Sequence, residues 1–226
     1  MSRGSQQKKL FLWIVLAVTI VLIVISQTAF AVGERNLEKA MQLFTAGQYD
    51  KALPEFEKAA SLGNHKAQTM LGVLYFQGKG TEKDYAKAGE WFDRAANSGD
   101  TEAQTFMGIM NLEGLGTPKN EKTACYWFEK AARGGETSAQ NYLGTLLMNG
   151  QGVEKDPVKA AKWFTKAAEN GDRNACKILG AMYLQGTGVP KDTGKARLWL
   201  QKAADQGDAD ATHLLAELRR QASSEK

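Results

Sequence analysis

Residues 137–172 read TSAQNYLGTLLMNGQGVEKDPVKAAKWFTKAAENGD, and the same 36-residue pattern begins again at residues 65, 101 and 173. The four copies follow one another without gaps, as residues 65–100, 101–136, 137–172 and 173–208. Each copy keeps a Gly at position 8, a Gly-x-Gly at positions 14–16, a Trp at position 27, an Ala pair at positions 31–32 and a Gly at position 35. A period of this length predicts a solenoid, in which each repeat packs on its neighbours.

Each copy is expected to form two helices and no strands. In residues 137–172 the first helix covers positions 2–13 and ends at Gly150, where a left-handed residue is needed. Asp156 is the expected N-cap of the second helix, with Pro157 as its first residue. The glycine at position 8, such as Gly144, costs about 1 kcal/mol relative to Ala, so we expect another helix backbone to approach it closely. The buried stripe of the second helix is predicted to be Ala160, Trp163, Phe164 and Ala167.

Two segments carry a recognisable pattern: AQTMLGVLY at residues 67–75 and KWFTKAA at residues 162–168. The chain resembles the Sel-1-like repeat proteins, a branch of the tetratricopeptide-repeat superfamily. The resemblance implies an all-α fold, a right-handed α-solenoid of antiparallel helix pairs that binds proteins or peptides and has no common catalytic site. Members often work in the bacterial envelope or in contact with a host. Shorter segments flank the four copies: a tetratricopeptide-like opening repeat at residues 36–64, and a C-terminal capping helix and tail at residues 209–226.

The first 31 residues predict export from the cytoplasm. A short basic stretch precedes the apolar run LFLWIVLAVTIVLIVI at residues 10–25, and Ala29-Phe30-Ala31 places small residues where a signal peptidase cuts. Extended to Val32, however, the run is long enough to span a bilayer of about 30 Å. Residues 1–31 are therefore either a cleaved signal peptide or a membrane anchor, in which case residues 10–32 contact the membrane. Both alternatives leave the repeats outside the cytoplasm, periplasmic or anchored to the inner membrane, with secretion as the alternative.

Charge and metal-binding residues exclude several functions. Arg3, Lys8 and Lys9 account for most of the net charge of +4, so the repeats are nearly neutral and no nucleic-acid footprint is expected. His65 and His213 lie about four repeats apart in the sequence, which argues against a shared metal site. No cofactor is expected. The two cysteines, Cys125 and Cys176, occupy different repeat positions and are interpreted as separate, small core or near-surface thiols.

The repeated motifs favour structure over catalysis. The Gly-x-Gly turns lack the strand, the third glycine and the Gly-Lys-Ser/Thr of phosphate-binding loops. The Trp row fits a helical core stripe better than a carbohydrate platform. Ser-x-x-Lys, which a penicillin-binding hydrolase would need, occurs only at Ser5–Lys8 and Ser223–Lys226, in the signal and the tail. We therefore expect a non-enzymatic protein, with a cell-wall or β-lactam hydrolase as a less favoured alternative.

A partner-binding surface is expected where the copies differ. On the first helix of each copy, positions 2, 5 and 9 lie away from the apolar stripe, on the face that lines the concave side of a tetratricopeptide-like stack. The function predicted is a non-catalytic protein–protein interaction scaffold of the bacterial cell envelope, with a host-contacting secreted effector as the alternative. The partner is predicted to be a protein or peptide held by these mostly uncharged side chains. They are Lys66, Thr69, Val73, Glu102, Thr105, Ile109, Ser138, Asn141, Thr145, Asn174, Lys177 and Ala181.

Overall fold

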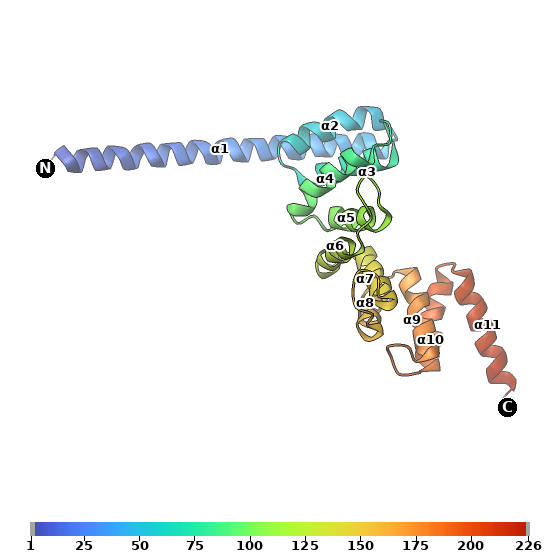
Figure 1. Cartoon of the computed structure of the whole chain (residues 1–226). Coiled ribbons are helices and arrows are strands. Elements are labelled where there is room, and N and C mark those ends of the chain that lie inside the picture. Colours follow the sequence, from blue (N-terminus) through green and yellow to red (C-terminus); the bar gives the residue numbers. More distant parts are fainter. Residues whose placement is uncertain (1–2, 225–226) are drawn as a thin grey trace. The chain divides into compact units, whose positions relative to one another are not determined.

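The computed structural model describes the backbone of residues 3–224 and the side chains of residues 12–220. Eleven helices and no strands occur in this part of the chain, so the all-α prediction is confirmed (Figure 1). The chain divides into two compact units, Met1–Arg94 and Ala95–Lys226, with the boundary inside a helix. Each unit is described by itself.

The first unit contains a very long helix followed by shorter ones. Helix α1 continues without interruption from the apolar segment into the opening repeat, and α2 packs along its C-terminal part (Figure 1). The core of this unit is built around Phe56, Leu71 and Leu74, which are fully buried. Its helices are α1 (Arg3–Thr45), α2 (Tyr49–Ser61), α3 (His65–Gln77) and the first turns of α4 (Tyr85–Asn97).

The second unit consists of three helix pairs and a final helix. Within each repeat the two helices pack against each other, and each pair also contacts the next element along the chain. One continuous core runs through them, with Phe128, Phe164 and Leu200 at its centre. The helices are α5 (Thr101–Glu113), α6 (Glu121–Arg133), α7 (Thr137–Asn149), α8 (Pro157–Glu169), α9 (Arg173–Gln185), α10 (Thr193–Asp205) and α11 (Ala209–Ser224).

In residues 137–172 the predicted helix boundaries are confirmed to within two residues, because the capping residues act as expected. Asp156 accepts a hydrogen bond from the Lys159 N–H at 2.9 Å, and Pro157 is the first residue of α8. Helix α7 ends at Gly150, which adopts a φ of 74°. The second glycine of the turn, Gly152, is also left-handed, and a Cβ there would collide with the backbone carbonyl of Glu121 in the preceding repeat. This glycine therefore lets one repeat's turn rest on the preceding helix pair.

The glycine at position 8 meets a side chain, where the sequence had suggested a helix backbone. A Cβ on Gly144 would lie 2.8 Å from Cε1 of Phe164, and Gly72 and Gly108 face Phe92 and Phe128 in the same way. The phenylalanine ring of the second helix thus occupies the space left by the missing side chain of the first. The expectation of backbone contact was wrong for these three copies, since sequence spacing does not distinguish a ring from a backbone.

The Trp row is less buried than its place in the apolar stripe predicted. Trp127 is buried, but Trp163 and Trp199 are half-buried and pack at the edge of the core. Lys166 lies over the Trp163 ring, with its Nζ 4.5 Å from the ring centroid. Phe164, one residue later and 1% exposed, occupies the centre instead. The stripe is correct, but its deepest residue is the phenylalanine.

Candidate partner-binding face

The predicted site residues separate into three rows of different exposure. Those at position 2 are exposed on all four first helices. At positions 5 and 9, Thr69, Thr105 and Val73 are buried, with at most 7% of each residue exposed, and the others are half-buried. A partner can therefore touch the exposed row directly, while the other two rows are largely enclosed. The exposed row is Lys66, Glu102, Ser138 and Asn174, and the half-buried residues are Ile109, Asn141, Thr145, Lys177 and Ala181.

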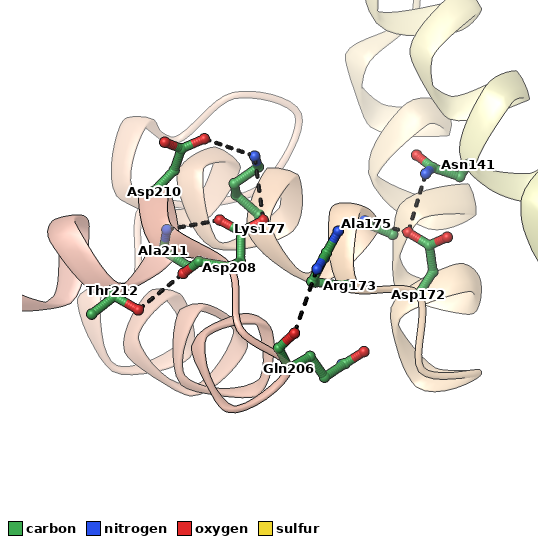
Figure 2. A network of polar contacts seen from close by, with 10 residues as sticks. All are labelled: Asn141, Asp172, Arg173, Ala175, Lys177, Gln206, Asp208, Asp210, Ala211 and Thr212. Carbon is green, nitrogen blue, oxygen red and sulfur yellow. Dashed lines mark hydrogen bonds and ion pairs between the residues drawn. The ribbon is translucent and has the colours of Figure 1, made fainter.

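Position 5 connects successive repeats in the second unit. Asn141 donates a hydrogen bond from Nδ2 to Oδ1 of Asp172, at 3.1 Å, and Asp172 begins the next first helix (Figure 2). One repeat later, Lys177 forms ion pairs with Asp208 at 3.4 Å and with Asp210 at 2.9 Å. Two of the residues predicted to bind a partner thus hold repeats together, a role that the sequence pattern did not reveal.

A second connecting row, at position 4, was missed by the sequence reasoning. The Gln104 and Gln140 side chains donate from Nε2 to the carbonyls of Ala96 and Ala132, at 3.1 and 3.4 Å. In the fourth copy Cys176 occupies the same place, and its Sγ lies 3.7 Å from the Ala168 carbonyl. The Gln that recurs at this position in three of the four copies was the available signal in the sequence.

An open groove of about 480 Å³ lies on the first-helix face, between α5 and α7. Four of the residues predicted from the sequence to bind a partner line this groove: Glu102, Thr105, Ile109 and Ser138. Phe106 and Tyr142 add aromatic surface, and Glu136 adds a second carboxylate. The groove combines apolar walls with two acids, and its volume falls in the range of ligand pockets.

The carboxylates of this groove repel one another. Although much of Glu102 is exposed, its pKa is raised, first by partial desolvation of the carboxyl group and then by the negative charges of Asp100 and Glu136. In the part of the chain whose side chains are described, no lysine, arginine or histidine forms an ion pair with Glu102 or Glu136. The groove therefore carries negative charge that the described protein does not neutralise.

Glu136 departs from the capping pattern of the other repeats. The equivalent residues Asn64, Asp100 and Asp172 each accept a hydrogen bond from the third N–H of the following helix, and so does Asp208. Glu136 occupies the N-cap of α7 without forming a side-chain cap. Because a cap contributes about 1 kcal/mol, this repeat gives up stability by carrying the longer acid.

The aromatic wall of the groove is fixed in place. The Tyr142 ring stacks on the buried Phe128, with centroids 4.7 Å apart and planes 10° from parallel. Tyr142 nevertheless remains 37% exposed. A ring held on one face and accessible elsewhere offers a preorganised contact surface.

Among residues 12–220 the possible metal ligands are not gathered into one group, and the two thiols are buried. Among the side chains of residues 12–220, no group of three or more His, Cys, Asp or Glu is placed to hold a metal ion. Cys125 and Cys176 are free and buried, and desolvation raises the pKa of both thiols, which lowers their nucleophilicity at neutral pH. The Ser5–Lys8 side chains and the complete Ser223–Lys226 motif lie outside the described residues.

The family follows from the comparison with known proteins. The Sel1 repeat profile matches residues 65–100, 101–136, 137–172 and 174–208, and the chain belongs to this family of helical solenoids. Sel1 repeat proteins are generally protein-interaction scaffolds, and the family is generally non-catalytic. No curated protein matches the chain with significance.

Solved structures share this fold. One is c5321 of uropathogenic Escherichia coli, described as a protective antigen displaying an SLR fold; it is 31% identical, with a TM-score of 0.76, over 87% of this chain and 42% of that chain. A Sel1 repeat protein from Oxalobacter formigenes is 37% identical, with a TM-score of 0.70, over 75% of this chain and 49% of that chain. The chain thus covers less than half the length of either relative. A putative Sel1 repeat protein from Klebsiella pneumoniae, 23% identical with a TM-score of 0.55 over 85% of this chain and 96% of that chain, shares the fold.

Proposed function

We propose that this protein is a non-catalytic scaffold that binds a protein or peptide partner on the exposed first-helix face, with its repeats outside the cytoplasm at the bacterial cell envelope. The observation that carries this proposal is the groove between α5 and α7, which four of the variable first-helix residues line. Residues that build the repeat recur from copy to copy, whereas the exposed row at position 2 changes from Lys to Glu, Ser and Asn. Variable side chains on an invariant scaffold are typical of a recognition surface.

The envelope location rests on the N-terminal segment. Helix α1 includes the one stretch among the described residues that is long and apolar enough to cross a membrane, with a mean hydropathy of 2.5 and no part of that stretch buried. Arg3, Lys8 and Lys9 precede it with no acidic residue among them, which favours a topology with the repeats outside the cytoplasm. A signal sequence would have the same composition, and both alternatives place the repeats on the same side.

Site-specific photocrosslinking in cells tests the binding face. A photoreactive amino acid replaces Ser138 or Asn174 on the first helices, and Lys122 or Lys159 on the second helices as matched exposed controls. We expect a discrete adduct, identified by mass spectrometry, from the first pair and none from the second. Equal adducts from both pairs, or none from Ser138 and Asn174, would contradict the assigned face. A stoichiometric adduct with a fluorescent penicillin would contradict the absence of catalysis.

A further inference from the structure

We propose that the groove between α5 and α7 binds an arginine side chain presented by a peptide segment of the protein partner. This inference rests on the proposed function, because it names the chemistry of the partner at the same face. The occupant is argued from charge complementarity: Glu102 and Glu136 line one groove, and neither is neutralised by a cation of the described chain. A cationic group from outside would pair with both carboxylates.

The departure at Glu136 supports a role in binding. At this position all the other repeats have the shorter Asp or Asn, and each of those side chains accepts a hydrogen bond from a backbone N–H. Glu136, which lines the groove, is one methylene longer than Asp and does not cap α7 with its side chain. The repeat therefore carries two features that do not help folding, a missing cap and a repelling acid pair, and both lie in the same groove.

The aromatic wall favours arginine over lysine. Tyr142 is held by its stacking on Phe128 and stays partly exposed at the groove. A planar guanidinium can stack on a tyrosine ring while its fork of N–H donors reaches a carboxylate, whereas an ammonium is a compact, strongly hydrated charge. The Ile109 side chain in the groove wall suits the aliphatic stem of the same side chain.

The neighbouring repeat lacks this chemistry at the equivalent positions. In the next repeat, Ser138 occupies the position equivalent to Glu102, and Asp172 occupies the position equivalent to Glu136. Asp172 is already engaged, since it accepts hydrogen bonds from Asn141 and from the Ala175 N–H (Figure 2). The equivalent positions of the next repeat therefore do not offer the same site.

The test uses the full chain in detergent micelles and a short fluorescein-labelled peptide with a central arginine flanked by leucines. Two further peptides replace the arginine by lysine or by citrulline, which is nearly isosteric but neutral. Fluorescence anisotropy should show saturable binding of the arginine peptide and at least about tenfold weaker binding of the citrulline peptide. The lysine peptide should fall between them. Equal affinity for arginine and citrulline, or no saturation of the arginine peptide by about 1 mM, would overturn the proposal.

Three variants assign the effect to the groove. Glu102→Gln removes one carboxylate, and Glu136→Asp keeps the charge but shortens the side chain to that of Asp172, the residue that caps α9 at the equivalent position. Both variants should weaken binding of the arginine peptide several-fold. Glu136→Asp should also raise the midpoint of unfolding, because the shorter side chain can cap α7. Glu113→Gln, which changes the same charge at an exposed position of α5 outside the groove lining, should bind like the wild type. Wild-type binding by both groove variants would overturn the proposal.

The outcome can be separated from that of the proposed function. If Ser138 crosslinks to a partner in cells while the arginine peptide does not bind, the arginine site is wrong and the scaffold function stands. If no residue of the first-helix face crosslinks, the scaffold function itself is wrong.

Discussion

Gly144 shows how a single residue determines the joint between two helices. Its missing side chain leaves the space into which the Phe164 ring inserts, and Phe164 is 1% exposed as a result. Glycine costs about 1 kcal/mol in a helix, but the buried ring outweighs this cost.

Gly144→Ala is therefore expected to destabilise the protein although alanine is the better helix former. The added Cβ would lie 2.8–3.0 Å from three atoms of the Phe164 ring, which must shift within a filled core. Overpacking of this kind costs about 1–3 kcal/mol of unfolding free energy. Denaturant unfolding of the full chain in micelles measures it.

The same substitution at Gly194 is the control. Gly194 is exposed in α10, and a Cβ there would approach only the Asp192 carboxylate, at 3.3 Å. Its effect should stay within about 0.5 kcal/mol. If both alanine variants were equally stable, the ring would not be what requires glycine at position 8.

The core stripe could be read from the sequence, but the depth of each residue within it could not. Trp163 and Phe164 are adjacent and both apolar, so periodicity places them on the same face. Which of them is central depends on where Gly144 opens space, a property of two helices together. The same limit affected Asn141 and Lys177, whose partners Asp172 and Asp208 lie 31 residues further along the chain and come near only in the folded stack.

At the scale of elements, the junction between α9 and α11 combines a cap with an ion pair. Asp208 accepts the Ala211 N–H at 3.0 Å and pairs with Lys177 (Figure 2). The Ala211 hydrogen bond is the main cause of a lowered pKa at Asp208, and the positive charge of Lys177 adds to it. Arg173 of α9 also reaches towards this junction, with its Nη1 3.5 Å from the Gln206 carbonyl.

This junction should make the C-terminal repeat sensitive to acid. Because the pKa of Asp208 is lower in the folded than in the unfolded chain, its contribution is complete above the unfolded value of about 3.9 and is lost as the pH falls through the folded value. Asp208→Asn keeps the cap but removes the charge. It should cost about 0.5–1 kcal/mol at pH 7 and flatten the loss of stability below about pH 4.

Glu102→Gln should change the pH dependence of stability in the opposite direction to Asp208→Asn, and it serves as the comparison. The pKa of Glu102 is raised, so the folded chain holds that proton more tightly and loses stability as the pH rises through the folded pKa. The amide does not titrate and removes this loss, so the variant should gain stability relative to the wild type on going from pH 4 to pH 7. Parallel unfolding curves of both variants against pH measure the two slopes. Slopes of the same sign would contradict the assignment.

Helix ends were predictable from the sequence, whereas the groove was predictable only in part. Caps and left-handed glycines are local signals, so Asp156 and Gly150 fix their boundaries without knowledge of the fold. Variability located Glu102 and Ser138 on the exposed row. Tyr142 and Glu136 were not chosen, because the first depends on stacking with a buried phenylalanine and the second on the absence of a cap, and neither is visible before the helices pack.

At the scale of the molecule, α1 joins the apolar segment to the opening repeat of the first unit. The helix passes through Ala31 without interruption, and Gly33 is already buried, close to Leu62. Phe30, just before it, is 67% exposed. The packed part of this unit therefore begins within two residues of the expected cleavage site, which leaves no flexible linker between the apolar segment and the repeat.

We expect the apolar segment to remain attached as an anchor, because it is long enough to span a bilayer and continues as the first helix of the packed unit. The protein isolated from cells should then have the intact mass of 24.7 kDa and should need detergent for extraction from membranes. Ala31→Leu, which removes the small residue at the expected cleavage site, should change neither the length of the chain nor its location, and the mass should differ only by the larger side chain. A wild-type chain beginning at Val32, with Ala31→Leu restoring the full length, would instead establish a cleaved signal peptide.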